Sequence, residues 1–571
     1  MAPTAWSAPM LSGLKGSYSL SYVIGWHGHV QEDRYLMVKT MLGVVLSITL
    51  LTAVMDKLDP CPDLQRLSRT SMTANCLEGH SVISSQAPSY PSDSAPKCRG
   101  VSGKTRIADP VGVGAMDLPV LPPSSAPVLS ISPNGYYFRL DGQPYFWVGD
   151  TAWYLNGYPA GYSTSDATRL LEDRATKGVR VVQSGLITSE TTQLPYDGGP
   201  DDPFIDSVPM ALNESYWAKI DHLVRETARL GMIFTIAPVW GAQNDLIFPD
   251  PDRHVEFVML IAKRYATQAH VVWIGAGEYQ KITYEGKTGT SIALSAAEKL
   301  RYSRVVDTIR AHAHSDSLIT FHPDGGKRTS IDWQSNAKVQ FNMHQAFSNI
   351  RAVIRDIPLE RAASPPKPVV EAEAYYEDVP PATVSTPWHI RMSAYHTAML
   401  GGAGYTYGSD LVWKSDPKWQ SRMTTEGSDN VFRSYRTFMR LIHDEGNVPA
   451  PTYLVDKGEV ARMDLNSYTS ALRNADNTRL YAYVSNGRSF KINTSLLAPG
   501  AISGQWYDPR QGMFQAKFNV KRRVSVLLDP PGSPMKKNDW ALVIGVTPLT
   551  TNSAMLTERR RVVRPSLSRA R

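Results

Sequence analysis

The sequence predicts an α/β protein: a (β/α)8 TIM barrel followed by a C-terminal all-β sandwich domain. Between residues 145 and 410, eight apolar runs with the length of strands alternate with stretches of helical spacing. Eight strand–helix units are what a barrel of this kind requires. After residue 450 the pattern changes to short alternating runs separated by turns, which predicts antiparallel strands. We therefore expect two folded domains.

The eight predicted barrel strands are largely apolar along their length, as expected for parallel strands covered on both faces. They are Tyr145–Trp153, Val179–Leu186, Met232–Trp240, Val271–Glu278, Leu318–Pro323, Val339–Gln345, Pro368–Tyr375 and Ala403–Asp410. Helical spacing lies between them at Ser165–Lys177, Tyr216–Leu230, Asp252–Thr267, Ser295–Ala313 and Trp388–Leu400. The connection from the fifth to the sixth strand has the weakest pattern. An open doubly wound sheet is the alternative, but Val148-Gly-Asp-Thr-Ala152 stands where a glycine-rich phosphate turn would be expected.

Four segments are predicted along the chain. Residues 1–127 form an N-terminal extension, 128–446 the catalytic barrel, 450–545 the β domain and 546–571 a basic tail. A hairpin with Asn-Gly and Asp-Gly turns opens the barrel domain, and a helix over Asn430–His443 closes it. The predicted strands of the β domain are Leu480–Val484, Ser503–Tyr507, Val524–Leu528 and Trp540–Ile544.

The charge of the chain does not indicate a nucleic-acid partner. The net charge of the 571 residues is +7, but the stretch from Gly545 onward has six arginines against one acid, Glu558. This tail accounts for five of the seven charges, so the remainder of the chain is nearly balanced, and a terminus of this kind is usually solvated. With 42% hydrophobic and 20% charged residues, the composition is that of an ordinary globular protein.

The N-terminal extension predicts secretion. The apolar run at 41–55 has the length of a signal-peptide core, and Met37 followed by Lys39 would be a suitable start. An uncleaved single membrane anchor is the alternative. The glycosylation sequons at Asn213 and Asn493 agree with secretion. All three cysteines lie before residue 125, so no disulfide framework or cysteine metal site is expected in the folded body: Cys61, Cys76 and Cys98.

Polar and aromatic residues gather at the C-terminal ends of the predicted strands, where barrels place their catalytic groups. Glu278 and Glu373 stand out, because glycoside hydrolysis needs one carboxylic acid to protonate the leaving oxygen and a second carboxylate to attack or to activate water. Each aromatic residue taken singly is more simply explained by core packing. The residues predicted to contact substrate are Asp150, Trp153, Gln183, Trp240, His322, His344, Gln345, Glu377 and Tyr407.

Other chemistries have less support from the sequence. The histidines of the same half show no His-Glu-x-x-His or comparable ligand spacing, and we predict neither a metal nor a cofactor: His322, His344, His389 and His396. Gly408-Ser409 lacks the Gly-x-Ser-x-Gly pattern of a serine nucleophile. Glu371 and Glu377 flank Glu373, and Glu371 lies deeper on the same face of the strand.

Several of these segments, taken in order, resemble the apiosidase-like glycoside hydrolases. The similar segments are Phe146-Trp-Val-Gly-Asp-Thr-Ala-Trp153, Leu171-Glu-Asp-Arg-Ala-Thr-Lys-Gly178, Val239-Trp-Gly241, Val272-Trp-Ile-Gly-Ala-Gly-Glu278, Phe321-His-Pro323, Glu371-Ala-Glu-Ala-Tyr-Tyr-Glu377 and Gly401-Gly-Ala-Gly-Tyr-Thr-Tyr-Gly408. The later segments Gln505-Trp-Tyr-Asp-Pro-Arg-Gln-Gly512 and Asn538-Asp-Trp540 resemble the collagen-binding type of C-terminal domain that follows such barrels.

This resemblance implies a retaining hydrolase that acts on plant cell-wall polysaccharide side chains, such as the apiose-linked chains of pectic rhamnogalacturonan II. It assigns the acid/base to Glu278, where the family pattern Trp-x-x-Gly-Gly-Asp ends in aspartate. It assigns the nucleophile to Glu373, where Glu-Ala-Glu-Ala replaces Asp-Gly-Glu-Pro. A glutamate is one methylene longer than an aspartate, so the sugar subsite is expected to differ.

The altered motifs also leave open a second kind of function. In that alternative the barrel is inactive and the protein binds carbohydrate or matrix through its β domain. Either way the predicted partner is an oligo- or polysaccharide, and a membrane is a partner only if residues 41–55 remain as an anchor. The sequence does not predict the oligomeric state.

Overall fold

The computed structural model describes residues 120–156, 161–187, 202–205, 211–240, 247–280, 283–284, 287–288, 293–380, 385–455 and 467–546. All of them fall within one compact unit, Pro110–Arg571. The predicted signal or anchor at 41–55, the start at Met37, the three cysteines and the basic tail after residue 546 lie outside the described residues. Within the described ranges, no helix is both long and apolar enough to cross a membrane.

A small three-stranded antiparallel sheet precedes the barrel, where the sequence predicted a two-stranded hairpin with the same Asn-Gly and Asp-Gly turns. It consists of β1 (Leu129–Ile131), β2 (Phe138–Leu140) and β3 (Gln143–Tyr145). The φ angles of Gly135 and Gly142 are 79° and 75°, which only glycine adopts without strain. Phe138 is fully buried, with ring centroids 5.7 Å from Trp147 and 5.3 Å from Phe341. These aromatic rings lie at the amino ends of barrel strands, so this sheet covers that end of the core.

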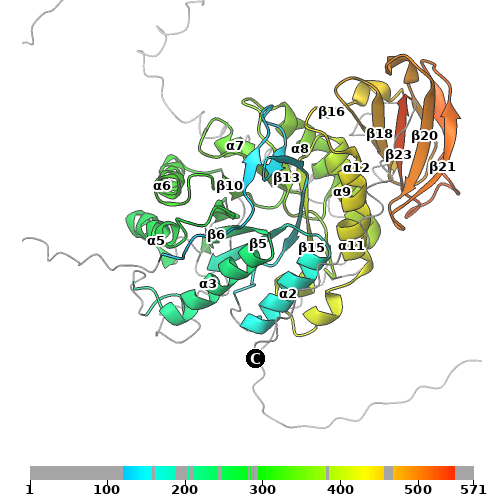
Figure 1. The fold of residues 1–571 in the computed structure, drawn as a ribbon. Helices are drawn as coiled ribbons and strands as arrows, with labels where there is room; N and C mark the ends of the chain where they lie inside the picture. Colours follow the sequence, from blue (N-terminus) through cyan, green and yellow to red (C-terminus); the bar gives the residue numbers. More distant parts are fainter. Residues whose placement is uncertain are drawn as a thin grey trace, which may run out of the picture. The chain divides into compact units, whose positions relative to one another are not determined.

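The eight predicted barrel strands are all present and parallel. They are β4 (Trp147–Thr151), β5 (Val181–Ile187), β6 (Ile233–Val239), β7 (Val271–Gly277), β10 (Ile319–His322), β12 (Asn342–Gln345), β13 (Val369–Glu371) and β15 (Gly404–Ser409). The ladder runs β10-β7-β6-β5-β4-β15-β13-β12, with every neighbour parallel. Its two ends meet where Gln340 N donates to Ile319 O at 2.9 Å and Thr320 Oγ1 donates to Phe341 O at 2.7 Å. The strands thus form a ring surrounded by helices (Figure 1).

Most of the surrounding helices begin at a capping side chain. They are α2 (Thr164–Thr176), α3 (Glu214–Arg229), α5 (Pro251–Arg264), α6 (Ala296–His312), α8 (Ile350–Ala362) and α9 (Pro387–Met399). Ser163, Asn213, Asp250, Ser295 and Asn349 each accept a hydrogen bond from a backbone N–H of the first turn of a helix. Asn213, the first predicted glycosylation site, is buried and used in this way.

The connection between β10 and β12 is the irregular one, where the sequence pattern was weakest. It contains only the short strand β11 (Lys327–Arg328) and the four-residue helix α7 (Ser330–Trp333). Trp333 stacks on Phe321 with centroids 4.5 Å apart and an interplanar angle of 11°. The side chain of Trp333, from the short helix α7, thus packs directly on a residue of barrel strand β10. The last barrel segment is also irregular: the π-helix Asn430–Tyr435 leads into α12 (Arg436–Ile442).

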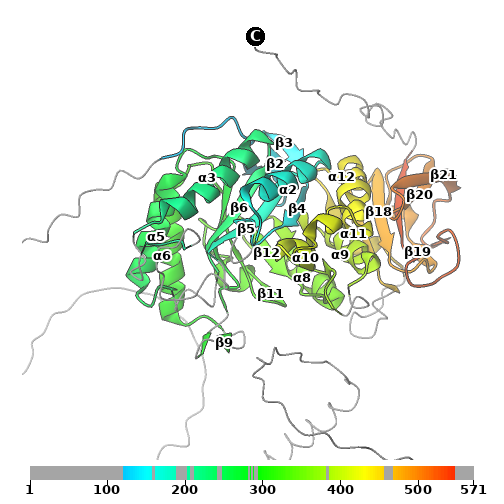
Figure 2. The ribbon, with the colours of Figure 1, turned by 90° about the horizontal axis from the view of Figure 1, so that it is seen from below.

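The C-terminal β domain packs a six-stranded antiparallel sheet against a two-stranded one (Figure 2). The larger sheet has the order β16 (Val448–Pro449), β17 (Thr469–Arg473), β18 (Arg479–Val484), β23 (Trp540–Val546), β20 (Ile502–Asp508) and β21 (Met513–Val520). The smaller one pairs β19 (Phe490–Ile492) with β22 (Val526–Leu528). Sequence reasoning missed β16, β17, β19 and β21. For β21 the sequence did carry a signal, because Phe514, Ala516, Phe518 and Val520 alternate with polar residues, although most of this edge strand is exposed.

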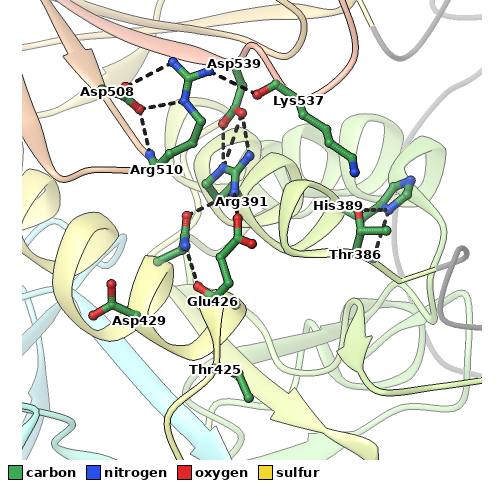
Figure 3. Close-up of polar contacts among 12 residues, drawn as sticks. Thr386, His389, Arg391, Thr425, Glu426, Asp429, Asp508, Arg510, Lys537 and Asp539 are labelled. Carbon is green, nitrogen blue, oxygen red and sulfur yellow. Dashed lines mark hydrogen bonds and ion pairs between the residues drawn. The ribbon is translucent and has the colours of Figure 1, made fainter.

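A buried ion pair fixes the β domain to helix α9 of the barrel. Arg391 donates to both carboxylate oxygens of Asp539, from Nε at 2.9 Å and from Nη2 at 2.8 Å. Its remaining nitrogen donates to Asn430 at 3.0 Å, so one guanidinium joins the β domain to two barrel segments (Figure 3). Tyr395 stacks on Tyr483 across the same interface at 4.9 Å.

His396, one of the histidines weighed as a metal ligand, lies at this interface too. Its two ring nitrogens are each 2.7 Å from a serine hydroxyl of the β domain, on Ser470 and Ser485. Burial lowers its pKa to about 3, so the ring is neutral. Its role is to join two packed surfaces by hydrogen bonds.

Candidate active site

The two glutamates singled out in the sequence follow barrel strands at their carboxyl ends. Glu278 comes directly after β7, and Glu373 comes two residues after the end of β13. In the ring, β10 and β12 separate these strands on one side, and β6, β5, β4 and β15 separate them on the other. The carboxyl end of a barrel is where catalytic side chains from different strands meet.

Glu278 accepts hydrogen bonds from neutral donors on both carboxylate oxygens. Trp240 donates from Nε1 to Oε2 at 3.2 Å, and Gln345 donates from Nε2 to Oε1 at 3.0 Å. Trp240 can lie here because residue 277 is glycine, since a Cβ on Gly277 would be 2.2 Å from the indole ring. Glu278 has a φ of 42°, in the left-handed region that is costly for a glutamate. Backbone strain of this kind gathers at functional sites.

Glu373 lies between a histidine and a tyrosine. His322 Nε2 is 3.6 Å from its Oε2, while His322 Nδ1 is 3.1 Å from the carbonyl oxygen of Pro323. Burial, the charge of Glu373 and a hydrogen bond to Glu373 together raise the pKa of Tyr376 well above its ordinary value. The hydroxyl of Tyr376 therefore keeps its proton and also accepts a hydrogen bond from Trp153 Nε1 at 3.0 Å. These contacts orient a carboxylate that remains 8% exposed.

Three rings connect the surroundings of the two glutamates. The centroids of Trp153 and Trp240 are 4.5 Å apart, and His322 lies 5.2 Å from Trp153 and 5.5 Å from Trp240. Because Trp240 contacts Glu278 and His322 contacts Glu373, both carboxylates belong to one cluster. Of the predicted site residues, the structure brings together Glu278, Glu373, Trp153, Trp240, His322 and Gln345.

Asp150 and Gln183 are both buried, away from any surface that a sugar could reach: Asp150 faces helix α2, and Gln183 lies inside the barrel. Asp150 is 1% exposed, and its carboxylate forms an ion pair with Arg174 at 2.6 Å. Burial raises the pKa of this carboxyl group. Gln183 is fully buried and donates to Thr151 Oγ1 at 3.0 Å and to the carbonyl of Ala372 at 2.9 Å. Both side chains support the strands, and the prediction that they contact substrate finds no support in their position.

His344 is also buried below the site, held between two carboxylates. Its Nδ1 contacts Glu371 and its Nε2 lies 3.2 Å from Asp356. Burial alone would lower the pKa of His344, but Glu371 and Asp356 raise it to about 9. The ring is therefore an imidazolium at neutral pH with both N–H groups in use. It leaves no ring nitrogen free for a sugar hydroxyl.

Glu377 and Tyr407 bind a loop of the protein. Tyr407 donates to Glu377 Oε2 at 2.6 Å, and the Gly427 N–H donates to Glu377 Oε1 at 3.1 Å. A Cβ on Gly427 would lie 2.5 Å from the same carboxylate, which explains the glycine. Thr425 Oγ1 also donates to Glu377, so this carboxylate fixes the loop before α11 (Glu426–Asp429). Both predicted substrate contacts are thus occupied by protein groups.

Two residues of the site were not among the predicted ones. Tyr376 appeared only within the segment Glu371-Ala-Glu-Ala-Tyr-Tyr-Glu377, yet it forms hydrogen bonds with Glu373 and Trp153. Phe347 is 65% exposed with a φ of 48°, and its N–H donates to the carbonyl of Glu373 at 3.1 Å. An aromatic residue two positions after a barrel strand was the available signal for Phe347. Among the described residues, no group of three or more His, Cys, Asp and Glu side chains is placed to hold a metal ion.

Two family models match this chain. The family model described as "Apiosidase-like, catalytic domain" matches residues 132–442, and the model described as "Putative collagen-binding domain of a collagenase" matches residues 448–545. No curated protein matches the chain.

Two solved structures with a similar fold are glycoside hydrolases by description. One described as "Glycoside hydrolase" has a TM-score of 0.60 at 18% identity and covers 75% of this chain and 99% of its own. A glycoside hydrolase family 5 protein from Bacteroides vulgatus ATCC 8482 has a TM-score of 0.60 at 18% identity, with 74% and 95% covered. At these identities the likeness shows the fold alone. The family model spans more than half of the sequence, and on that basis the chain belongs to the apiosidase-like glycoside hydrolases and is a glycosidase.

Proposed function

We propose that this glycosidase works with retention of anomeric configuration, with Glu373 as the nucleophile and Glu278 as the acid/base. The observation that carries the proposal is the single cluster of Trp153, Trp240 and His322, which links the surroundings of the two carboxylates at the ends of β7 and β13. A glycosidic bond held over this cluster would have one carboxylate on each side. This is the arrangement that two-carboxylate hydrolysis needs.

The reaction proceeds in two steps. Glu373 attacks the anomeric carbon while Glu278 gives a proton to the departing oxygen, which leaves a glycosyl ester on Glu373. Glu278, now ionised, removes a proton from a water molecule, and the resulting hydroxide displaces Glu373 from the sugar. Tyr376 stays protonated and orients the nucleophile. Gln345 and Trp240 hold both oxygens of Glu278 in place between the steps.

The anomeric form of the first product tests the mechanism. We expect proton NMR of the initial hydrolysate to show the configuration of the starting glycoside. For Glu278→Ala, we expect a large loss on substrates with poor leaving groups, little loss on a dinitrophenyl glycoside, and partial recovery with azide. For Glu373→Gln, every leaving group should react slowly, because the covalent step itself is lost. An inverted first product would rule out the nucleophile role of Glu373.

The proposed substrate is a sugar on a side chain of a plant cell-wall polysaccharide, of the pectic rhamnogalacturonan type. Membership of the apiosidase-like family supports this substrate class, and secretion of the protein would be required to reach it. Incubation with purified rhamnogalacturonan II, followed by analysis of released monosaccharides, tests the substrate. N-terminal sequencing of the exported protein tests secretion, for which we expect a start after the 41–55 segment.

Phe347 supports a polymeric substrate. Its ring is exposed beside the Glu373 backbone, and the C–H face of a sugar ring packs well on an aromatic face. Phe347→Ala should raise KM for an oligosaccharide about tenfold while leaving kcat on a small aryl glycoside nearly unchanged. Equal effects on both substrates would place Phe347 outside the binding surface.

A further inference from the structure

A groove on the β domain has the lining of a binding site. It has a volume of about 760 Å³, within the usual range of ligand sites, and lies between β21, β22 and the segments that flank β22. Phe518 and Leu527 supply apolar surface, and Leu527 is 64% exposed although it is a large apolar residue. Asn519 and Asp529 add polar groups on the walls. The groove therefore offers both apolar surface and hydrogen-bonding partners.

Two cations line this groove, Lys521 and Arg523, and both side chains are exposed. Neither takes part in an ion pair found among the described residues. Arg522, between them, is different: it donates to the carbonyl oxygens of Leu497 at 2.7 Å and Gly500 at 3.1 Å, which binds it to the domain itself. Of these three consecutive cations, Lys521 and Arg523 are therefore the two that can bind a ligand.

The charge of the whole domain has the same sign. Residues 467–546 contain eleven Lys and Arg but only four Asp and no Glu, and Asp539 and Asp508 are already paired with Arg391 and Arg510. The barrel has the opposite balance, with 31 Lys and Arg against 36 Asp and Glu in residues 128–446. A basic domain beside an acidic one attracts an anionic partner to the basic side.

We propose that this groove binds a carboxylate-bearing polysaccharide, with uronate groups on Lys521 and Arg523 and sugar faces on Phe518 and Leu527. Sugar rings have apolar C–H faces and polar edges, which matches a groove of mixed lining. Asp529 already accepts a hydrogen bond from Ser489 at 2.7 Å, and its second oxygen is suited to a sugar hydroxyl. The proposal assigns a second carbohydrate site, independent of the catalytic residues.

Other occupants fit the groove less well. The chain's own segment 547–571 has six arginines and one glutamate, so its charge has the same sign as the groove. The acidic barrel of a second copy has the complementary sign, and measurement of the oligomeric state distinguishes that case. Double-stranded DNA and collagen are the remaining alternatives, and both serve as competing probes below.

The test uses the full-length protein and polygalacturonate, with its fully methyl-esterified form as a neutral probe of the same backbone. We expect binding of polygalacturonate that weakens in high salt, and little binding of the ester. Lys521→Ala/Arg523→Ala should weaken binding about tenfold, the effect of two exposed ion pairs. Lys517→Ala/Lys536→Ala removes the same charge outside the groove and should change binding less than twofold. Leu527→Ser tests the apolar wall and should also weaken binding.

Each contrary result overturns the proposal. Equal weakening by the two double variants would mean that the domain attracts anions without a site. Equal binding of the ester, tighter Lys521-dependent binding of DNA or collagen, or a dimer blocked by Lys521→Ala/Arg523→Ala would assign the groove to another ligand. Activity of Lys521→Ala/Arg523→Ala on a small aryl glycoside should be unchanged, which separates this test from failure of the catalytic assignment.

Discussion

Glu371 and Glu373 are the same residue type two positions apart, yet the protein treats them differently. Glu371 ends β13, is fully buried, and gives its oxygens to His344 and to the backbone N–H of Ala346 at 3.1 Å. Glu373 lies two residues beyond the end of β13 and is 8% exposed, and its Oε2 is 3.6 Å from His322 Nε2. The inner carboxylate has its partners within the protein, and the outer one keeps access to a substrate.

The same division applies to the other acids of this face. Glu377, like Glu371, is occupied by Tyr407 and Gly427, while Glu278, like Glu373, lies in the aromatic cluster. What separates the two kinds is which protein groups the neighbouring strands and loops present to each carboxylate. We therefore expect substitutions of the inner acids to change stability and substitutions of the outer acids to change catalysis.

The largest contrast should be in activity. Glu373→Gln removes the nucleophile and should reduce kcat by about 10⁴-fold or more. Its melting temperature should stay within a few degrees of the wild type, because His322 lies 3.6 Å from Glu373, beyond hydrogen-bond distance, and a glutamine can still accept the hydrogen bond from Tyr376. Folded Glu371→Gln should keep most of its turnover when assayed well below its melting temperature. A Glu371→Gln protein that is folded but as inactive as Glu373→Gln would break the division.

For the free energy of unfolding, we expect the opposite order, with the larger loss in Glu371→Gln. Glu371→Gln leaves the buried His344 imidazolium with one carboxylate partner fewer, and breaking a buried ion pair costs about 3–5 kcal/mol. Urea unfolding followed by tryptophan fluorescence measures this cost, with Glu373→Gln as the matched control at less than about 1 kcal/mol. A similar loss in both variants would contradict the contrast.

The sequence predicted the architecture well because the barrel strands carry a strong local signal. A run such as Val271-Val-Trp-Ile can be little else than a buried strand, and the carboxyl ends of seven barrel strands were predicted to within two residues. The exception is β13, which ends at Glu371 and not at Tyr375. The β10 to β12 connection was harder, because a stacked aromatic pair has no periodic pattern. Strand β21 does alternate apolar and polar residues, and that signal was overlooked. The order of strands around the ring followed from the barrel rule.

The site was predicted only in part, since burial is decided by tertiary contacts. Glu278 and Glu373 could be selected by position, but nothing local tells that Asp150 faces Arg174 or that His344 lies between two carboxylates. Each is polar and near a strand end, as a ligand-binding residue would be. The partner of each lies on the next helix or strand of the chain, 12 to 27 residues away, but which side chains meet there depends on the packing of these elements.

The pH dependence of stability sharpens the description of the inner acids. A histidine in the unfolded chain has a pKa of 6.5, and Glu371 and Asp356 raise the pKa of His344 to about 9 in the folded protein. The stabilisation is therefore complete below pH 6.5 and is lost as the pH rises toward 9, by up to about 3 kcal/mol. Urea unfolding at pH 6 and at pH 9.5 measures it. Glu371→Gln should flatten this dependence, and Glu373→Gln should leave it intact.

The smallest expected effect concerns the donors that position an outer acid. Trp240→Phe keeps an aromatic ring over Gly277 but deletes the 3.2 Å hydrogen bond from Nε1 to Glu278. We expect kcat to fall about tenfold, near the value of one hydrogen bond to a charged group, with KM little changed. Gln345→Glu, which turns the other donor into an acceptor, should shift the pH profile of kcat as well. A donor that acts only through packing would lower stability and leave the pH profile of kcat unmoved in both variants. In that outcome, side-chain packing alone would hold Glu278 in place. Glu371, by comparison, is held by a charged histidine and by hydrogen bonds, so the inner and outer acids would differ even more in how they are positioned.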